Sequence, residues 1–276
     1  MSFYTVDSQS CIRCGLCSQV CTTRIIKADS NGLPFIPEER TTSCIRCGQC
    51  VVFCPEACNS LAFQDGPLPL IDASLFPSPQ SAETLLRSRR SIRNFKAQPA
   101  PRELLERALE TARYAPTAQN LQSIRWLVLE SSEKVAELER QVIESFKELS
   151  ENPPLGVSPK QAATLKGIVK VFEAGIPIIF RGAPHLAIAI APTGGNFTTE
   201  DGVVALTYLE LAAHALGLGC CWAGFFTLAC RASRTLCNAL GLKESEQVVG
   251  AQMLGYPLYG LSKRLPPRKE IEVTWL

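Results

Sequence analysis

The first sixty residues of the chain contain the same cysteine pattern twice, and this repeat constrains the fold more than any other feature. Four cysteines with the spacing C-x2-C-x2-C-x3-C recur after a shift of 33 residues, and the pentapeptide CIRCG occurs in both copies. The first quartet is Cys11, Cys14, Cys17 and Cys21, and the second is Cys44, Cys47, Cys50 and Cys54. Such a duplication predicts two similar halves stacked on one another.

This cysteine spacing is typical of ligands to [4Fe–4S] clusters. Three thiolates separated by two residues surround one face of a cubane, and the fourth reaches the other cluster. The spacing therefore assigns Cys11, Cys14, Cys17 and Cys54 to one cluster, and Cys44, Cys47, Cys50 and Cys21 to a second. A pair of zinc sites is the alternative, but zinc knuckles use two CxxC pairs or mixtures of cysteine and histidine. We interpret the further Cys58 as a small buried residue near a cluster.

Composition and charge exclude several classes of protein. The chain has 13 cysteines, an odd number, which argues against a secreted disulfide framework and favours the reducing cytoplasm. The first residues, MSFYTVDSQS, lack the basic and apolar regions of a signal peptide. The longest apolar stretch, residues 203–230, is interrupted by Glu210 and His214, so we expect a buried helix and no membrane span. A net charge of +2 gives no bulk attraction to nucleic acid.

A length of 276 residues favours two compact units. We predict a first domain at residues 1–64, a linker at 65–80 and a second domain at 81–276. Four prolines between Gly66 and Gln80 predict that the linker is extended. The periodicity of the second domain mixes helices and strands, which predicts an α+β fold. The expected helices are 101–116, 135–149, 160–173, 199–216 and 230–240, the expected strands are 124–129, 186–190 and 248–254, and the tail 270–276 is expected to be extended.

An arginine-rich segment opens the second domain. Arg87, Arg89, Arg90 and Arg93 lie within seven residues, with Ser91 among them. Apolar residues at 85, 86, 92 and 95 are interleaved, so we expect a packed segment and not a free arm. Guanidinium forks and a hydroxyl suit a phosphate held at a fixed place. The alternative is a solvated basic surface or a nucleic-acid patch.

Two resemblances to known families follow from these motifs. Residues 3–64 resemble the bacterial two-cluster ferredoxins, although Thr22 stands where the second quartet has Pro55 after its last cysteine. Residues 81–276 resemble the nitroreductase family, flavoproteins that bind FMN between two subunits. Four motifs in order carry this likeness: RRSIRNF at 89–95, YAPTAQNLQ at 114–122, GLGCCWAGF at 217–225, and GYP at 255–257 followed by basic residues. The whole resembles a branch with a ferredoxin module fused ahead of the nitroreductase domain.

The nitroreductase resemblance implies a homodimer with FMN at the subunit interface. It implies that Arg89, Ser91 and Arg93 are the first-choice ligands of the flavin's phosphate and that Arg90 is a further cofactor-binding residue. Charge from the end of the chain would come from Arg264 and Arg268, with Lys269 as a further candidate. Pro116, Thr117 and Asn120 would reach the flavin of the other subunit, while Cys221, Trp222, Ala223 and Gly224 would form one wall of the flavin pocket.

The predicted function is an iron–sulfur flavoprotein oxidoreductase. Clusters carry single electrons, whereas a flavin collects two, so the fused modules would pass electrons through FMN to a small organic acceptor. Nitroaromatics, quinones and activated alkenes fit such a site, and the external donor would be ferredoxin or NAD(P)H. The alternative is a redox sensor or electron carrier without its own turnover. No acid–base residue stands out. His214 falls among apolar residues and fits a core role, and His185 begins a strand, where a substrate contact is the less favoured interpretation. Cys230 and Cys237 are expected on one buried helical face.

Overall fold

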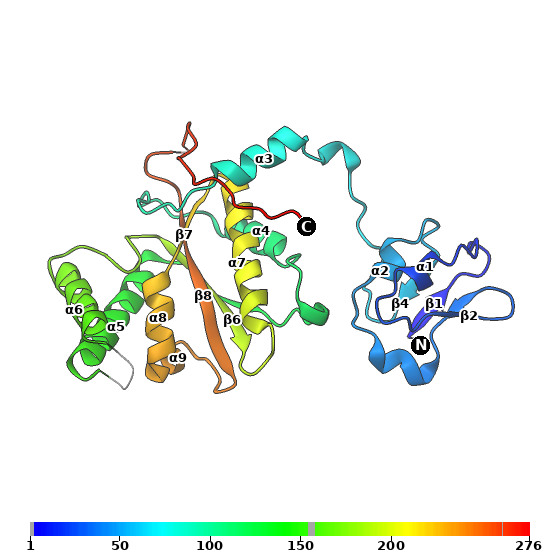
Figure 1. The fold of residues 1–276 in the computed structure, drawn as a ribbon, viewed down its shortest axis with the longest axis horizontal. Helices are drawn as coiled ribbons and strands as arrows, with labels where there is room; N and C mark the ends of the chain where they lie inside the picture. Colours follow the sequence, from blue (N-terminus) through cyan, green and yellow to red (C-terminus); the bar gives the residue numbers. More distant parts are fainter. Residues whose placement is uncertain (1–2, 154–157, 261) are drawn as a thin grey trace. The chain divides into compact units, whose positions relative to one another are not determined.

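The computed structural model describes residues 3–153, 158–260 and 262–276, which divide into two compact units (Figure 1). Unit 1 comprises Met1–Phe76 with Gln119–Leu121, and unit 2 comprises Pro77–Ala118 with Gln122–Leu276. The predicted boundaries, with a first domain that ends at residue 64 and a second that begins at residue 81, stay a prediction. Among the described residues, no helix has both the length and the apolar character that a bilayer crossing requires.

Unit 1 is built from short elements around a small core. Its strands are β1 (Tyr4–Val6), β2 (Lys27–Ala28), β3 (Pro34–Phe35) and β4 (Asn59–Leu61), and its helices are α1 (Leu16–Gln19), α2 (Gln49–Val52) and the 3-10 turns η1 (Glu38–Ser43) and η2 (Ala73–Leu75). Antiparallel pairing of β1 with β4 joins the start and end of the duplicated segment. Ile25 and Ile26 are almost completely buried in the core between the two copies.

The two copies of the repeat form equivalent helices. Both α1 and α2 follow a glycine in the left-handed region, Gly15 at φ 72° and Gly48 at φ 73°. The two helices pack against each other. A residue with a Cβ would be strained at either glycine. Each cysteine-rich loop can therefore turn sharply into its helix, in agreement with the predicted stacking of two halves.

The segment predicted to be an extended linker contains regular structure. The 3-10 turn η2 lies inside it, and α3 (Pro79–Ser88) begins before its end. The carboxylate of Asp72 accepts a hydrogen bond from the N–H of Ser74, which supports the turn. The Ser78 hydroxyl accepts from the N–H of Ser81 and caps α3. Pro79 stands at the first turn of the helix, where its missing N–H costs nothing, so the helix begins before the end of the segment that the proline count marks as extended.

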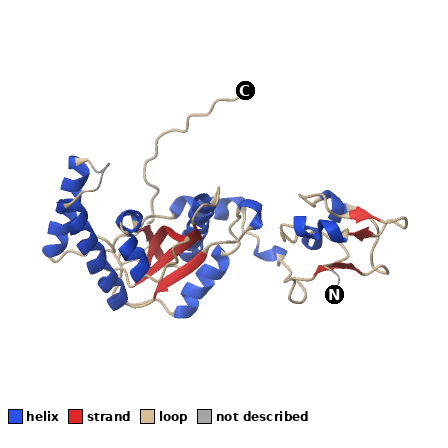
Figure 2. Cartoon of the chain, turned by 90° about the horizontal axis from the view of Figure 1, so that it is seen from below, coloured by secondary structure: helices blue, strands red, loops and turns tan. Residues whose placement is uncertain are grey.

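Unit 2 is a four-stranded antiparallel sheet with helices on both faces (Figure 2). The strand order is β5 (Arg125–Leu129), β6 (His185–Pro192), β8 (Glu246–Gly255) and β7 (Gly219–Trp222). The helices are α3, α4 (Arg102–Ala112), α5 (Ser132–Glu151), α6 (Pro159–Glu173), α7 (Thr198–Ala215), α8 (Gly224–Ala232) and α9 (Arg234–Ala239), with the 3-10 turn η3 (Ala118–Asn120) assigned partly to unit 1. The strand expected at 186–190 is central, and the α+β prediction is confirmed.

Side-chain size on β6 alternates between the two faces of the sheet. Its large residues pack against α5 and α8, and these are Leu186, Ile188 and Ile190. Its small residues, Ala187, Ala189 and Ala191, face the side that α7 covers. Small side chains let a helix approach a sheet closely, and at Gly202 of α7 a Cβ would come within 2.6 Å of Val249. The fold therefore brings the polar side chains of α7 next to β7 and β8.

One predicted helix is broken in the structure. Residues 230–240 span the end of α8 and the whole of α9, because Ser233 is extended and its hydroxyl caps α9 by accepting from the N–H of Leu236. Cys230 and Cys237 therefore lie on different helices and not on one helical face. Both are buried, and the Cys237 thiol lies 3.3 Å from the carbonyl of Cys230.

Candidate functional site

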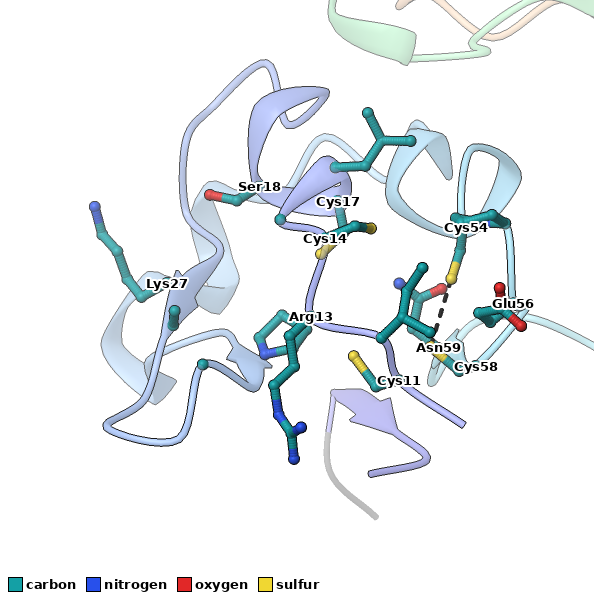
Figure 3. A pocket seen from close by; sticks show the side chains of 17 residues that line it. Cys11, Arg13, Cys14, Cys17, Ser18, Lys27, Cys54, Glu56, Cys58 and Asn59 are labelled. Carbon is teal, nitrogen blue, oxygen red and sulfur yellow. Dashed lines mark hydrogen bonds between the residues drawn. The ribbon is translucent and has the colours of Figure 1, made fainter. Parts of the chain in front are cut away.

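The eight cysteines of the repeat surround two separate cavities. One cavity of about 50 Å³ is lined by Cys11, Cys14, Cys17 and Cys54, together with Cys58 (Figure 3). A second of about 20 Å³ is lined by Cys21, Cys44, Cys47 and Cys50. Each cavity thus combines three cysteines of one quartet with the fourth of the other, which is the grouping that the spacing assigns. The role of these cysteines as cluster ligands stays a prediction.

Backbone amides stand close to several of these sulfur atoms. The N–H of Arg46 donates to Cys44 Sγ at 3.4 Å. At Cys21, burial opposes ionisation, but the N–H of Ile25 and the Thr23 hydroxyl outweigh it and lower the pKa of the thiol. Donors of this kind stabilise a thiolate and tune the potential of a cluster bound to it. The loops are therefore folded in a form that suits thiolate ligands.

Cys58 is not the small buried residue that we expected from the sequence. Its side chain is partly exposed and lines the first cavity, and its Sγ lies 3.5 Å from Sγ of Cys54. Burial and the contact with Cys54 raise the pKa of Cys58, whereas N–H groups of the following turn outweigh burial and lower the pKa of Cys54. Cys54 is therefore the more readily ionised thiol of this pair.

Unit 2 contains a basic cavity of about 370 Å³ at the end of α3. Its charged lining consists of Arg87, Arg89, Arg90 and Arg268. Desolvation and the positive charges of Arg268 and Arg89 lower the pKa of Arg90. Like charges gathered in this way are stabilised by an anion, and guanidinium groups match the geometry of a phosphate. The structure therefore brings together three of the predicted cofactor-binding residues, Arg89, Arg90 and Arg268.

Arg89 has a buried partner that the sequence prediction missed. Its Nη1 lies 2.9 Å from Oε1 of Glu210 on α7. Burial raises the pKa of Glu210, and the positive charge of Arg89 opposes this shift. The sequence did contain a signal, because a lone glutamate in a long apolar stretch needs a compensating cation. One turn further along α7, Nε2 of His214 lies 2.9 Å from the Ser88 hydroxyl, so this histidine is half-buried and hydrogen-bonded.

The segment from Ser91 to Lys96 connects three of the sequence motifs. Ser91 forms a parallel bridge with Cys220, and the N–H of Ile92 donates to the carbonyl of Cys220 at 2.8 Å. Further along, the N–H of Lys96 donates to the carbonyl of Tyr256 in the GYP motif. The arginine-rich motif, the β7 motif and the GYP motif therefore meet at one edge of the sheet.

Two predicted arginines lie outside the group around Arg90. Arg93 is exposed, and together with Arg181 it opposes the burial that raises the pKa of Cys221. Arg264 is exposed in a turn where its N–H donates to the Ser262 hydroxyl. Lys269 is exposed as well. Of the three basic candidates near the end of the chain, Arg268 is the one that lines the basic cavity.

The predicted flavin-wall residues follow β7 into α8. Cys221 and Ala223 are buried, and the N–H of Ala223 donates to the carbonyl of Ala251 at 2.9 Å. Trp222 packs over β8, where a Cβ at Gly250 would come within 2.6 Å of its ring. Gly224 is exposed and begins α8, so the first N–H groups of this helix have no intrahelical acceptor. These residues offer a ligand mainly backbone groups.

The loop that is predicted to contact the flavin of the other subunit is held at the N-terminal end of α7, opposite the end that carries Glu210. The N–H of Ala118 donates to Oδ1 of Asp201 in the first turn of α7. Thr117 lines a different cavity, of about 480 Å³, with Trp126 and Arg113. Pro116 is exposed. Asn120 belongs to unit 1, where its Nδ2 donates to the carbonyl of Arg46 at 3.0 Å.

The comparisons with known proteins agree with these features. The family model for the nitroreductase family matches residues 86–256, and that for a 4Fe-4S binding domain matches residues 4–27. An iodotyrosine deiodinase of Thermotoga neapolitana is 29% identical over 49% of this chain and 69% of its own length.

Solved structures show the same fold for unit 2. A nitroreductase with bound FMN from Desulfitobacterium hafniense has a TM-score of 0.55 at 22% identity, covering 70% of this chain and 97% of its own. An FMN- and NADPH-dependent nitroreductase from Sphigopyxis sp. strain HMH has a TM-score of 0.52 at 22% identity, covering 71% and 98%. Since the family match spans more than half of the chain, the protein belongs to the nitroreductase family and carries an N-terminal 4Fe-4S binding domain.

Proposed function

We propose that this protein is an FMN-dependent oxidoreductase that passes electrons from two [4Fe–4S] clusters through FMN to a small organic acceptor. The observation that carries the proposal is the division of eight cysteines into two cavities, within a chain whose second unit has the nitroreductase fold. When bound, the clusters supply one-electron transfer and FMN supplies two-electron chemistry. A small organic acceptor such as a nitroaromatic, a quinone or an activated alkene would receive the electrons that FMN collects from the clusters.

The cysteine cavities fit clusters better than single ions. Each has at least four thiols on its wall, and in the second cavity the N–H of Arg46 donates to Cys44 Sγ. Cys11, Cys14, Cys17 and Cys54 would hold one cluster, and Cys44, Cys47, Cys50 and Cys21 would hold the other. Thiol groups in this number require a reducing compartment, for which we propose the cytoplasm.

The basic cavity fits the phosphate of FMN. Arg89, Arg90 and Arg268 would bind its oxygens, and the buried carboxylate of Glu210 would hold Arg89 in place. Charge-assisted bonds of this kind contribute about 1.5–3 kcal/mol each. Ser91 and Arg93 follow directly in the chain and would bind the parts of the cofactor nearer to β7. There Cys221, Trp222, Ala223 and Gly224 would form one wall of the flavin pocket.

A homodimer would complete this site. Pro116, Thr117 and Asn120 would then serve the flavin of the other subunit. Unit 2 exposes large apolar side chains that a single chain leaves in water, among them Phe197 at 56%, Tyr259 at 82% and Trp275 at 90%. We expect a second copy of this chain to cover side chains of this kind.

The electron donor is proposed to be reduced ferredoxin or NAD(P)H. The cysteine cavities favour a one-electron donor such as ferredoxin, because clusters accept one electron at a time. The NADPH dependence of the Sphigopyxis relative supports the second choice for the flavin itself. A chain that uses both donors would accept single electrons at its clusters and deliver two electrons from its flavin.

Anaerobic spectroscopy of the purified full chain tests the proposal. We expect about eight iron atoms and one FMN per chain, a dimer in solution, and steady turnover of a nitroaromatic or quinone with reduced ferredoxin. A control with Arg89→Ala and Arg93→Ala should lose FMN and turnover but keep its iron. A monomer with stoichiometric FMN would contradict the shared site. Fast exchange of electrons between iron and flavin, without turnover of any acceptor, would instead identify an electron carrier or redox sensor.

A further inference from the structure

We propose that Cys58 is an alternative ligand for the iron atom assigned to Cys54, so that the first cavity has five thiols for four ligand positions. The proposal rests on the proposed function, since it requires a cluster in that cavity. In Figure 3 the side chains of Cys58, Cys54 and Cys11 lie together on one side of the cavity. The Sγ atoms of Cys54 and Cys58 are 3.5 Å apart, so the two thiols lie within reach of one position.

The backbone holds Cys58 in this place independently of Cys54. Its carbonyl accepts from the N–H of Asp7 at 2.7 Å, which fixes Cys58 to the end of β1. The next residue, Asn59, is buried and donates to the Cys50 carbonyl at 3.0 Å. The main chain on this side of the cavity is therefore anchored, while the thiol of Cys58 is directed into the cavity.

The turn between the two cysteines allows either thiol to be presented. Pro55, Glu56 and Ala57 are all exposed, and the N–H of Ala57 closes the turn on the carbonyl of Cys54 at 3.2 Å. Ala57 takes a left-handed φ of 47°, which lets the turn double back. A small adjustment of an exposed turn does not disturb the core. Exchange of one ligand for the other therefore leaves the rest of the fold in place.

The repeat shows that this thiol is particular to one cavity. The shift that relates the quartets places Cys58 opposite Ile25, which is 1% exposed in the core. Cys21, the counterpart of Cys54, has the Thr23 hydroxyl near its sulfur, at 3.7 Å. The second cavity thus has four thiols on its described lining, and the first has five. The two halves of the repeat are therefore unequal at the corner where each exchanges a ligand with the other.

The exchange involves no electron transfer. The bond between iron and Cys54 Sγ breaks and a bond to Cys58 Sγ forms. The proton released by the Cys58 thiol is taken up by the Cys54 thiolate, so the charge of the cluster and the oxidation state of its irons are unchanged. The consequence is that loss or modification of Cys54 leaves the first cluster with four ligands.

Iron content of the full chain, loaded anaerobically, provides the first test. Wild type, Cys54→Ala and Cys58→Ala should each keep about eight irons, because four thiols remain at the first cavity. Cys54→Ala combined with Cys58→Ala should lose iron there and acquire the paramagnetic signal of an oxidised three-iron cluster. The proposal is overturned if Cys54→Ala alone loses the same iron and gives the same signal. The second cluster serves as an internal measure that each variant is folded.

Cys21→Ala is the matched control, because Ile25 offers no thiol to replace it. It should lose iron from the second cavity. Full retention of iron in this variant would show that a fourth thiolate is dispensable, and would also overturn the proposal. If wild type binds no iron, the proposed function fails together with this inference, whereas a loaded wild type with a depleted Cys54→Ala variant removes only the inference.

Thiol labelling of the loaded protein gives a second, independent reading. With iodoacetamide and mass spectrometry, Cys58 should be alkylated in wild type but protected in Cys54→Ala, where it binds iron. The other seven cluster cysteines should be protected in both. Alkylation of Cys58 to the same extent in both proteins would overturn the proposal, and would leave Cys58 as a neighbour that only contacts the Cys54 sulfur.

Discussion

Arg89 and Glu210 form an ion pair with 2.9 Å between Nη1 and Oε1, and this pair joins the arginine-rich segment to the long helix α7. The arginine side chain is 26% exposed and the glutamate 9%. One side of the guanidinium is therefore held by a buried carboxylate, while the same residue lines the basic cavity. The carboxylate fixes the arginine, but it also places a negative charge beside an anion site.

Removing Arg89 should weaken FMN binding more than the loss of one phosphate contact explains. In Arg89→Ala the carboxylate of Glu210 loses its cation and repels the phosphate. We expect the Kd for FMN to rise by more than tenfold, which is more than about 1.4 kcal/mol, in a fluorescence titration. Arg89→Ala with Glu210→Gln should recover part of this loss, because the uncompensated charge is gone. Equal affinity of the two variants would show that the pair has no influence on the site.

Arg268 and Arg264 should differ in their effect on FMN. Arg268 lines the basic cavity and lowers the pKa of Arg90 by its charge, whereas Arg264 is exposed in a turn. Arg268→Ala should therefore weaken FMN binding about tenfold, the loss of one charge-assisted bond. Arg264→Ala has the same change in net charge and should alter the Kd less than twofold. A larger effect of Arg264→Ala would place the phosphate elsewhere along the tail.

A methyl group at Gly219 should separate the arginine-rich segment from β7. A Cβ there would meet Ile92 at 2.7 Å, and Ile92 is hydrogen-bonded to the neighbouring Cys220. Overpacking of this kind costs about 1–3 kcal/mol, so Gly219→Ala should lower the Tm of the FMN-free protein and weaken FMN binding. Gly224→Ala is the control, since a Cβ at Gly224 has no neighbour within 4 Å among the described residues. Its Tm should stay at the wild-type value.

Acid should weaken unit 2 through Glu246. Its carboxylate accepts two hydrogen bonds from Arg125, at 2.7 and 2.8 Å, and these with the N–H of Lys243 lower its pKa to about 2. An unfolded glutamate has a pKa of about 4.3, so the folded state binds fewer protons. The resulting stability is present above that value and is lost as pH falls toward 2.

Thermal unfolding of Glu246→Gln at several pH values checks this expectation. Its Tm should be lower than that of wild type at neutral pH, and the two should converge as pH falls from about 4.5 to 2. Arg102 and Glu130 form a comparable pair at the surface, with both side chains more exposed, and Glu130→Gln serves as the control with a smaller effect. A constant difference between wild type and Glu246→Gln across this pH range would contradict the assignment.

Patterns that repeat along the chain were predictable because their chemistry depends on local spacing. The quartets specified which cysteines share a cavity, since a fixed number of intervening residues limits which thiols can meet. Helices and strands with strong periodicity, such as β6 and α7, lie within a few residues of the expected ranges. The break at Ser233 and the start of α3 at Pro79 were missed, because a hydroxyl cap or a first-turn proline resembles a breaker when only composition is considered.

The sequence by itself determined the cysteine repeat, the α+β character and the family of the second unit. Tertiary structure alone decided which arginines gather, because Arg268 is separated from the adjacent Arg89 and Arg90 by most of the domain and meets them only when the chain end returns to α3. It likewise decided the partner of Arg89, since the helix that carries Glu210 is positioned by packing on the small residues of β6. The place of Cys58 beside Cys54 also required the fold, because its direction depends on the anchoring of its backbone to β1.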